Sequence, residues 1–180
     1  MTRKYEIAKQ IYRGRIFDVR LEAHRLPNGR QATFEIVRHP GGAAILPVLD
    51  DGRVLLIKQY RPAVSAMVYE IPAGRLEVGE SPRDCALREL EEETGYSASR
   101  ISPLGGFFAA VGYCDEYIEL FLASGLVQAE QNLEPDEVVE LSPMSFDQAM
   151  HKLSVGTITD CKTQVALLRY QQQLSDEERR

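Results

Sequence analysis

Residues 74–96, GRLEVGESPRDCALRELEEETGY, predict a loop that leads into a single helix. Ser81 is a good N-cap, Pro82 suits the first helical position, and Asp84 completes a capping box with Ser81. Gly95 supplies the left-handed residue with which helices commonly end. The sequence therefore predicts a helix bounded by Ser81 and Gly95, and the rest of the chain is organised around it.

One face of this helix is acidic. At about 100° per residue, Glu89, Glu92 and Glu93 share that face with Cys85. The opposite face is predicted to pack on a core and carries Ala86 and Leu90. Like charges three and four residues apart repel one another, so the cluster indicates a divalent metal ion between the carboxylates. A solvated acidic face is the alternative that three glutamates alone would favour.

Length and composition favour one globular domain with a small N-terminal appendage. The chain has 180 residues, of which 44% are hydrophobic, and this is enough to bury a core. Its net charge is -6 and no basic cluster is present, so a nucleic-acid-binding surface is not expected. Small phosphorylated ligands remain compatible with this charge.

The sequence predicts neither a membrane span nor a secretory signal. No apolar run approaches the ~20 residues that a membrane-spanning helix needs, and residues 1–10 are too polar for a signal peptide. The cysteines, Cys85, Cys114 and Cys161, lack the spacing of metal ligands and suit free thiols in a reducing compartment. A cytoplasmic location is therefore expected.

Hydrophobic periodicity predicts a mixed α/β sandwich, with strands around the central helix and further helices behind them. Residues 17–23 and 31–37 alternate apolar and polar side chains on either side of a Pro-Asn-Gly turn, whereas residues 5–12 are mixed. Together, residues 5–38 predict a small antiparallel meander. Because three strands alone are marginally stable, this meander needs a surface to lie against. The other strands are predicted at residues 43–49, 54–60, 68–71, 104–110, 117–123 and 138–141, and the other helices from Ser145 and over residues 160–174.

The central stretch also fits a longer pattern, G-x5-E-x7-R-E-U-x-E-E-x-G-U, in which U is an apolar or aromatic residue. Its fixed positions are filled by Gly74, Glu80, Arg88, Glu89, Leu90, Glu92, Glu93, Gly95 and Tyr96. The chain resembles the Nudix hydrolases, whose signature is this box. The resemblance implies a Nudix-type α/β/α sandwich at residues 41–180, preceded by the antiparallel β meander at residues 1–40.

The resemblance to Nudix hydrolases implies hydrolysis that depends on Mg²⁺, or on Mn²⁺ in its place. Hard carboxylate oxygens suit Mg²⁺, which keeps waters while it bridges to substrate phosphates. By resemblance, the metal is held by Glu89, Glu92, Glu93 and the backbone carbonyl of Ala73. Arg88 is expected to pair with a box glutamate and hold its rotamer during catalysis, with a surface ion pair as the alternative.

Stretches outside the box resemble ADP-ribose pyrophosphatases and related nucleoside diphosphate sugar hydrolases. They are Tyr12-Arg13-Gly14-Arg15-Ile16, Gln59-Tyr60-Arg61-Pro62, Glu70-Ile71-Pro72-Ala73-Gly74, Asp115-Glu116 and Ile158-Thr159-Asp160-Cys161-Lys162-Thr163. This resemblance implies that Arg61 contacts the diphosphate and that Glu70 helps at the metal site. It implies that Arg15 and Glu116 help to bind the substrate, and that the protein is a homodimer in which N-terminal strands cap the partner's nucleoside site. For Arg61, a structural ion pair is the alternative.

In ADP-ribose hydrolases the catalytic base often comes from an acidic loop late in the chain. Residues 130–140 form such a loop here, and Glu137 fits best because the apolar pair after it resumes a strand and pins the loop. Glu134 is the second candidate. The alternative is a loop that is acidic only because it is solvated.

The expected reaction splits the diphosphate of ADP-ribose or a related nucleoside diphosphate sugar into a nucleoside monophosphate and a sugar phosphate. One departure bears on the sugar, because Val111 stands where ADP-ribose hydrolases usually carry a proline. GDP-mannose or another sugar nucleotide is therefore an alternative substrate. A non-catalytic sugar-nucleotide-binding module is the alternative class, but such modules typically lose box carboxylates and none is missing here.

Overall fold

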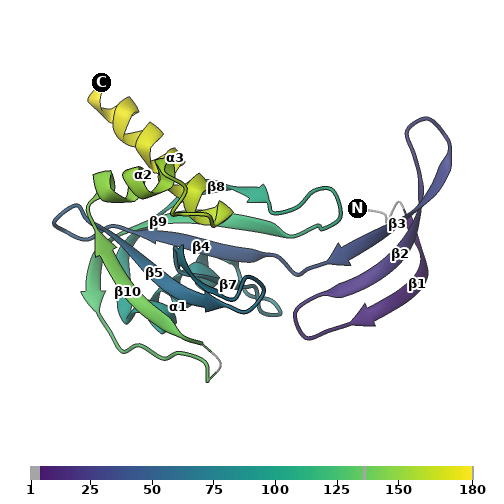
Figure 1. Cartoon of the computed structure of the whole chain (residues 1–180), viewed down its shortest axis with the longest axis horizontal. Helices are drawn as coiled ribbons and strands as arrows, with labels where there is room; N and C mark the ends of the chain where they lie inside the picture. Colours follow the sequence, from purple (N-terminus) through teal and green to yellow (C-terminus); the bar gives the residue numbers. More distant parts are fainter. Residues whose placement is uncertain (1–4, 136, 180) are drawn as a thin grey trace. The chain divides into compact units, whose positions relative to one another are not determined.

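The computed structural model describes residues 5–135 and 137–179, which divide into two compact units. The first unit comprises Met1–Gly41 and Phe108–Tyr117, and the second comprises Gly42–Phe107 and Ile118–Arg180. The first unit therefore contains a segment from the middle of the chain in addition to the predicted N-terminal meander. Figure 1 shows the order of the elements.

The first unit is built on the predicted meander. Strands β1 (Tyr5–Arg13), β2 (Asp18–Arg25) and β3 (Gln31–Arg38) form an antiparallel sheet in the order β1-β2-β3. The segment Phe108–Tyr117 joins this sheet at Val37, whose N–H donates to the carbonyl of Tyr113 at 2.7 Å. The prediction of an N-terminal antiparallel meander is confirmed.

A buried ion cluster, rather than an apolar core, holds the first unit together. Glu22 is fully buried and accepts hydrogen bonds from Arg38, with 2.9 Å from Nε to Oε1, and from His24 at 3.1 Å. Arg38 also donates to Asp115 at 2.8 Å and lies over the ring of Tyr5. Burial alone would raise the pKa of Glu22, but the bonds from Arg38 and His24 outweigh burial and lower it.

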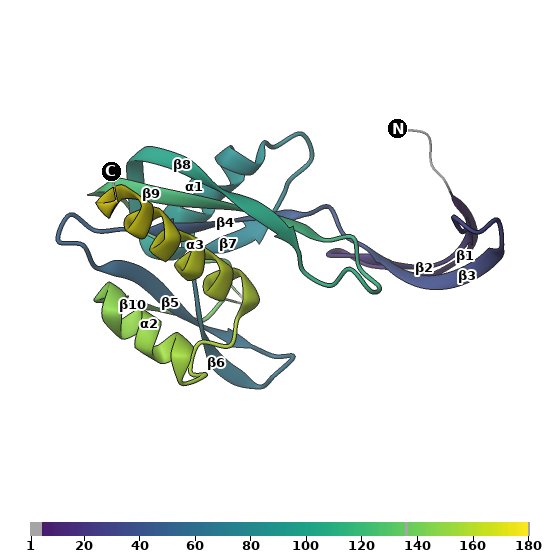
Figure 2. The same cartoon turned by 90° about the horizontal axis from the view of Figure 1, so that it is seen from above.

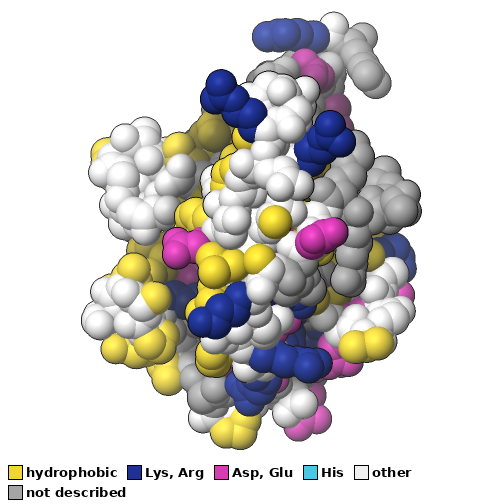
Figure 3. Space-filling model, turned by 90° about the vertical axis from the view of Figure 1, so that its right-hand side faces the viewer, with side chains coloured by type: hydrophobic (Ala, Val, Ile, Leu, Met, Phe, Trp, Pro, Cys, Tyr) yellow, Lys and Arg dark blue, Asp and Glu magenta, His cyan; other side chains and the backbone are white. Residues whose placement is uncertain are grey.

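Among the side chains that the structure describes in the first unit, no apolar one is buried. Several apolar side chains are instead exposed on the meander and its turn, namely Ile11, Tyr12, Ile16, Phe17 and Phe34. Figure 3 shows hydrophobic side chains next to Lys and Arg on one face of the molecule. A sheet that exposes apolar side chains in this way is a candidate for contact with another surface.

Two sheets and three helices of the described chain form the second unit, shown from above in Figure 2. One sheet has the order β7-β4-β9-β8 and contains β4 (Gly42–Pro47), β7 (Ala73–Arg75), β8 (Tyr96–Phe108) and β9 (Tyr117–Gln128). The other has the order β10-β5-β6 and contains β5 (Val54–Arg61), β6 (Ala66–Glu70) and β10 (Val139–Met144). The helices are α1 (Pro82–Thr94), α2 (Phe146–Ser154) and α3 (Cys161–Glu178).

Strand β4 separates two hydrophobic cores because successive side chains of a strand point to opposite faces. Ala43 and Ile45 belong to the core that contains Leu90 of α1. Ala44 and Leu46 belong to the core that contains residues of α2 and α3. The continuous apolar run of β4 thus reflects burial on both faces, and the predicted mixed α/β sandwich is confirmed.

The ends of α1 lie close to their predicted places. Ser81 accepts a hydrogen bond from the N–H of Asp84 at 3.2 Å, and Gly95 ends the helix with a left-handed φ of 70°. The capping box is incomplete, however, because the Asp84 carboxylate accepts from the hydroxyl of Ser81 rather than from its N–H. Cys85 is buried with Ala86 in the core, and its sulfur also lies 3.5 Å from Nη2 of Arg88, beside the acidic face.

Several element boundaries differ from the prediction. Strand β9 ends at Gln128 rather than at residue 123, and β10 ends at Met144 rather than at residue 141. Strand β8 begins at Tyr96 rather than at residue 104, and the part before residue 104 mixes polar residues with Ala98 and Ile101 and ends at Pro103. Because β8 is the edge of its sheet, polar residues and proline are tolerated there and leave no strict apolar alternation. Helix α3 continues to Glu178, beyond the predicted end at residue 174. No helix of the described residues is long and apolar enough to cross a membrane.

Candidate active site

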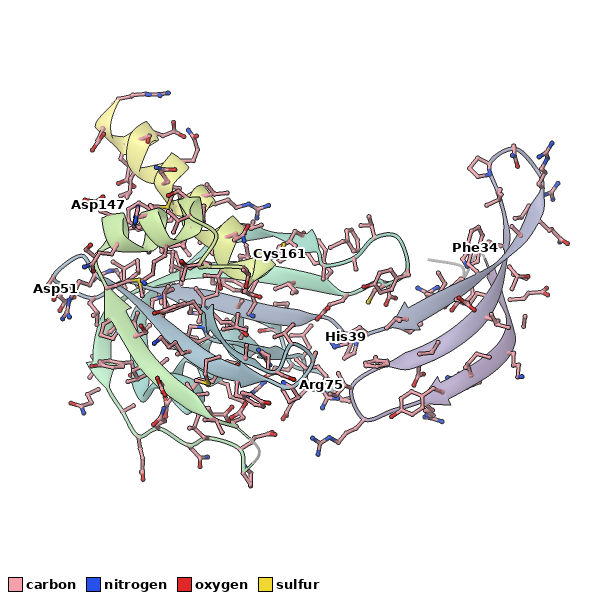
Figure 4. The ribbon with its side chains drawn as sticks, in the orientation of Figure 1. Phe34, His39, Asp51, Arg75, Asp147 and Cys161 are labelled. Carbon is pink, nitrogen blue, oxygen red and sulfur yellow. The ribbon has the colours of Figure 1, made fainter. Side chains whose placement is uncertain are left out.

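Arg88 joins the acidic residues of α1 to the loop that precedes it. Its guanidinium donates to Glu80 at 2.8 Å, to Glu89 at 2.6 Å and to Glu92 at 2.9 Å. A further bond at 3.3 Å goes to the carbonyl of Arg75, which ends β7 and is labelled in Figure 4. The bond from Arg88 lowers the pKa of Glu80 to about 2. The loop is thus folded back on the helix, as an orienting role for Arg88 requires.

Glu93 and Glu89 are the buried carboxylates of this face. Glu93 is 1% exposed and accepts a hydrogen bond from the N–H of Ala73 at 2.9 Å. Burial, followed by the nearby charge of Glu89, raises the pKa of Glu93 to about 8. Burial also raises the pKa of Glu89. Gly74 is required beside them, because a Cβ atom there would lie 1.7 Å from Oε1 of Glu89.

The predicted metal ligands are brought together, but they do not form a ready cage. Glu89 and Glu92 share the Arg88 guanidinium, while Glu93 turns toward Ala73. Within the described residues, no three His, Cys, Asp or Glu side chains make a group that could hold a metal ion as they stand. The donor set nevertheless fits a hard divalent cation, since buried carboxylates with raised pKa values are stabilised by added positive charge.

A second ionic cluster surrounds Glu70 at the end of β6. Arg61 donates to both Glu70 oxygens at 2.7 Å in a bidentate pair, and the ammonium of Lys162 contacts the same carboxylate. Lys162 also donates to Asp160 at 3.1 Å. Burial would raise the pKa of Glu70, but the hydrogen bonds from Arg61 and the charge of Lys162 outweigh it and lower the pKa.

The two clusters influence each other electrostatically. The charge of Glu93 contributes to the raised pKa of Arg61, after the larger effect of the Glu70 bond. The charge of Lys162 in turn acts to lower the pKa of Glu93 against the larger effect of burial. The second unit therefore contains both the carboxylates of α1 and the cationic side chains of Arg61 and Lys162, which are paired with Glu70.

The family of the chain follows from a match that spans these clusters. The family model described as the NUDIX domain matches residues 38–160. The chain belongs to the Nudix hydrolase family. The box, the buried glutamates of α1 and Arg61 all lie inside the matched segment.

Individual relatives agree with this assignment. An ADP-ribose pyrophosphatase of Bacillus subtilis (strain 168) is 40% identical over 164 residues, which cover 89% of this chain and 89% of that protein. A methanol dehydrogenase activator of Bacillus methanolicus is 40% identical over 161 residues, covering 88% and 87%. The solved structure of an ADP compounds hydrolase is 22% identical but has a TM-score of 0.82 over 99% of this chain and 98% of that chain, so the fold is shared.

In this Nudix chain, the candidate base Glu137 lies in the acidic loop between β9 and β10. Its charge contributes to the raised pKa values of Glu89 and Glu93, after the larger effects of burial and nearer charges. Its carboxylate also accepts a hydrogen bond from the N–H of Glu134 at 2.8 Å. Glu134 itself is exposed. Of the two candidates, Glu137 is thus the one whose charge reaches the Nudix glutamates.

The other predicted substrate residues, Arg15 and Glu116, lie in the first unit. Arg15 occupies the turn between β1 and β2, and a Glu116 oxygen lies 3.5 Å from Nδ1 of His39. The loop with Val111 also belongs to this unit, and Val111 is exposed. Their roles toward the Nudix box stay predictions.

Lys162 and Asp160 belong to the cluster around Glu70 although the sequence predicted no role for them. Lys162 contacts both Glu70 and Asp160. Both belong to the segment that begins α3, which was predicted as a helix and matched by resemblance without a role for either side chain. Cys161 between them is exposed and labelled in Figure 4. The available signal was a lysine in the first turn of the helix, two residues after the N-cap aspartate, where cations are disfavoured by the helix dipole. A lysine at such a place indicates a specific carboxylate partner.

Proposed function

We propose that this chain hydrolyses the diphosphate bond of ADP-ribose or a related nucleoside diphosphate sugar, releasing a nucleoside monophosphate and a sugar phosphate. One observation carries the proposal, namely that one unit contains both the buried glutamates of the Nudix box and Arg61, which is held by Glu70. Carboxylates can hold a metal ion on a diphosphate, and a guanidinium can bind its oxygens in a bidentate manner. The name of the Bacillus subtilis relative supports ADP-ribose as the first substrate to test.

The proposed cofactor is Mg²⁺, with Mn²⁺ as the second choice. Glu89, Glu92, Glu93 and the carbonyl of Ala73 would hold it, and Arg88 would keep Glu89 and Glu92 in orientation. When bound, the ion would neutralise phosphate oxygens and acidify the attacking water. Support comes from the buried, incompletely balanced charges of Glu89 and Glu93.

The remaining roles are assigned to groups that bind the diphosphate or move a proton. Arg61 would bind the diphosphate oxygens, and Glu70 with Lys162 would hold its guanidinium in place. Glu137 would take the proton of the attacking water as general base, with Glu134 as the second candidate. The effect of the Glu137 charge on Glu89 and Glu93 supports this choice.

The proposed assembly is a cytoplasmic homodimer in which the meander of residues 1–40 contacts the partner. Arg15 and Glu116 would then help to bind the substrate. The dimer is supported by the exposed apolar side chains of a unit in which no described apolar side chain is buried. The location is supported by the cysteines, which are all free thiols and therefore suit a reducing compartment.

The proposed reaction is tested by measuring kcat/KM for ADP-ribose, ADP-glucose and GDP-mannose, first with Mg²⁺ and then with Mn²⁺. Proline would stiffen the backbone at position 111, whereas valine leaves it freer. We therefore expect the values for these sugars to lie within about tenfold of one another, or ~1.4 kcal/mol. A preference above a hundredfold for ADP-ribose would contradict this broad specificity, and no turnover of any of them would overturn the proposed reaction.

The matched control for the reaction is Glu93→Gln, which keeps the size of the side chain and removes its charge. Loss of a metal ligand should lower kcat by about a thousandfold or more while the fold is retained. Circular dichroism would check the fold. Activity equal to that of the wild type at the same Mg²⁺ concentration would exclude Glu93 as a ligand.

A further inference from the structure

The acidic loop that carries Glu137 is tied to the C-terminal end of α1. The side chain of Gln131 donates from Nε2 to the backbone carbonyl of Glu93 at 2.7 Å. The backbone N–H of Asn132 donates to the carbonyl of Glu92 at 3.0 Å. These bonds satisfy carbonyls in the last turn, which a helix leaves without partners of its own.

Gly95 allows the loop to approach this closely. The N–H of Ala129 donates to the Gly95 carbonyl at 2.7 Å. A Cβ atom on Gly95 would lie 3.2 Å from the backbone nitrogen of Gln131, and its φ of 70° is left-handed. The glycine that ends the helix therefore also leaves room for the start of the loop.

The far end of the loop is anchored beside the phosphate-binding candidate. The carbonyl of Val138 accepts a hydrogen bond from the N–H of Tyr60 at 3.1 Å, one residue before Arg61. Between the two anchors, Glu134 and Glu137 close a turn, with the Glu137 N–H donating to the Glu134 carbonyl at 3.0 Å. The position of Glu137 thus depends on both anchors.

We propose that Gln131 is a positioning residue that holds Glu137 in place through the end of α1. Glu92 and Glu93 would then have two roles. Their side chains would bind the metal, and their backbone carbonyls bind the loop that carries the proposed base Glu137. One rigid element sets the distance between the base and the metal ligands. This inference rests on the proposed function, in which Glu137 is the base.

Gln131→Ala tests the role because it removes a side-chain bond and leaves the backbone bonds of the loop intact. A neutral hydrogen bond contributes enough that its loss should lower kcat by about three- to tenfold. KM should stay unchanged, since the side chain of Gln131 bonds to the backbone of Glu93 and not to the diphosphate-binding candidate Arg61. The melting temperature should change little because Gln131 is exposed and one neutral hydrogen bond contributes only about 1 kcal/mol. An unchanged kcat would overturn the inference.

Matched variants separate the side-chain bond from general disturbance of the loop. Asn132→Ala keeps the backbone N–H that contacts Glu92 and should leave kcat unchanged. Gln131→Arg retains a donor for the carbonyl and should restore kcat, because a cation is favourable at a helix C-terminus. Gln131→Glu is similar in size but cannot donate, so it should lose at least as much kcat as Gln131→Ala. Equal losses in all four variants would contradict a specific role of this bond.

A double substitution separates failure of this inference from failure of the proposed base. Glu137→Gln alone should lower kcat by about 10² to 10⁴. If Gln131 acts through Glu137, adding Gln131→Ala to this variant should cause no further loss. Losses that multiply would overturn the positioning role, whereas a normal kcat for Glu137→Gln, with Glu134→Gln impaired instead, would move the base to Glu134.

Discussion

Glu93 carries a charge that the protein balances only in part. Its side chain is buried and accepts a hydrogen bond from the Ala73 N–H, while Arg88 bonds to Glu89 and Glu92 instead. A buried carboxylate without a close cation favours its protonated form. Burial of the charged form is therefore unfavourable in the metal-free protein, and it raises the pKa of Glu93 to about 8.

Metal-free protein should lose stability as the pH rises from about 4.5 to about 8. Glu93 binds its proton more tightly in the folded state, with a pKa of about 8 against an ordinary 4.5, so its stabilising effect is complete below pH 4.5 and lost through pH 8. The loss is on the order of a few kcal/mol, and each kcal/mol lowers the melting temperature by about 2–4 °C in a protein of this size. Melting curves in EDTA at pH 5 to 9 measure the effect.

Glu93→Gln is the control for this pH dependence, because glutamine does not titrate. The variant should melt at a higher temperature than the wild type at pH 8.5, and the difference should shrink toward pH 5. Adding Mg²⁺ should raise the melting temperature of the wild type at pH 8.5 more than that of the variant. Parallel curves for the two proteins would show that Glu93 does not cause the effect.

For single residues, the sequence predicts which side chains share one face of a helix. The spacing of Glu89, Glu92 and Glu93 is enough to place them on one face, because periodicity is a local property. Burial of Glu93 is different, since it depends on β7, which the helix meets only in the folded unit. The pairing of Lys162 with Glu70 likewise joins residues that no local pattern connects.

The first turn of α3 is fastened to the end of β6. The Asp160 carboxylate accepts from the N–H of Thr163 at 2.9 Å and so caps the helix. The Thr163 hydroxyl accepts from the N–H of Ile71 at 2.8 Å, while Lys162 contacts Glu70. Neighbouring residues of the helix therefore bond to neighbouring residues of the strand, and they support the carboxylate that holds Arg61.

Lys162→Met should destabilise the protein and raise KM. Removing one cation from a buried carboxylate costs about 1–3 kcal/mol, and Glu70 would then hold Arg61 more tightly and compete with the diphosphate for its guanidinium. Urea unfolding and steady-state kinetics measure the two effects. Glu70→Gln combined with Lys162→Met should be less destabilised than the sum of the single variants, because neither partner is left as an unpaired charge. Additive losses would contradict the pairing.

Among whole elements, those with an apolar pattern or a cap could be predicted. The helix predicted from Ser145 begins there with a complete capping box, and β4 shows the buried run that its composition indicates. The part of β8 before residue 104 could not be predicted, since an edge strand needs no strict apolar alternation and tolerates Pro103. Helices and strands could thus be predicted where one of their faces is buried, because burial produces a regular spacing of apolar residues in the sequence.

The two units differ in how they are held together. All residues of both hydrophobic cores belong to the second unit, whereas the first is organised around Glu22 and Arg38. A polar cluster gives a sheet specificity but little hydrophobic stabilisation. The first unit is therefore expected to gain stability from a surface that covers its apolar side chains.

The protein should be a homodimer at micromolar concentration, with the meander in the interface. Ile11 and Phe17 are exposed in the described chain at 51% and 40%, and burying them would supply part of the association energy. The double variant Ile11→Asp/Phe17→Asp should shift sedimentation toward the monomer, while Val127→Asp, at an exposed position of β9, should not. A wild-type protein that sediments as a fully active monomer would contradict the dimer.

The parallel pairing of β4 with β9 has a consequence for synthesis on the ribosome. Gly42 pairs with Ile118, and Phe121 and Ala123 of β9 complete the core on the α1 side of β4. A nascent chain emerges N-terminus first, at about 5–20 residues per second. Strand β4 therefore leaves the ribosome several seconds before β9, with which it pairs. Contacts between such distant segments also form slowly once both are available. The apolar side chains of β4, which belong to both cores, therefore stay exposed to chaperones and to aggregation until the chain beyond residue 118 has emerged.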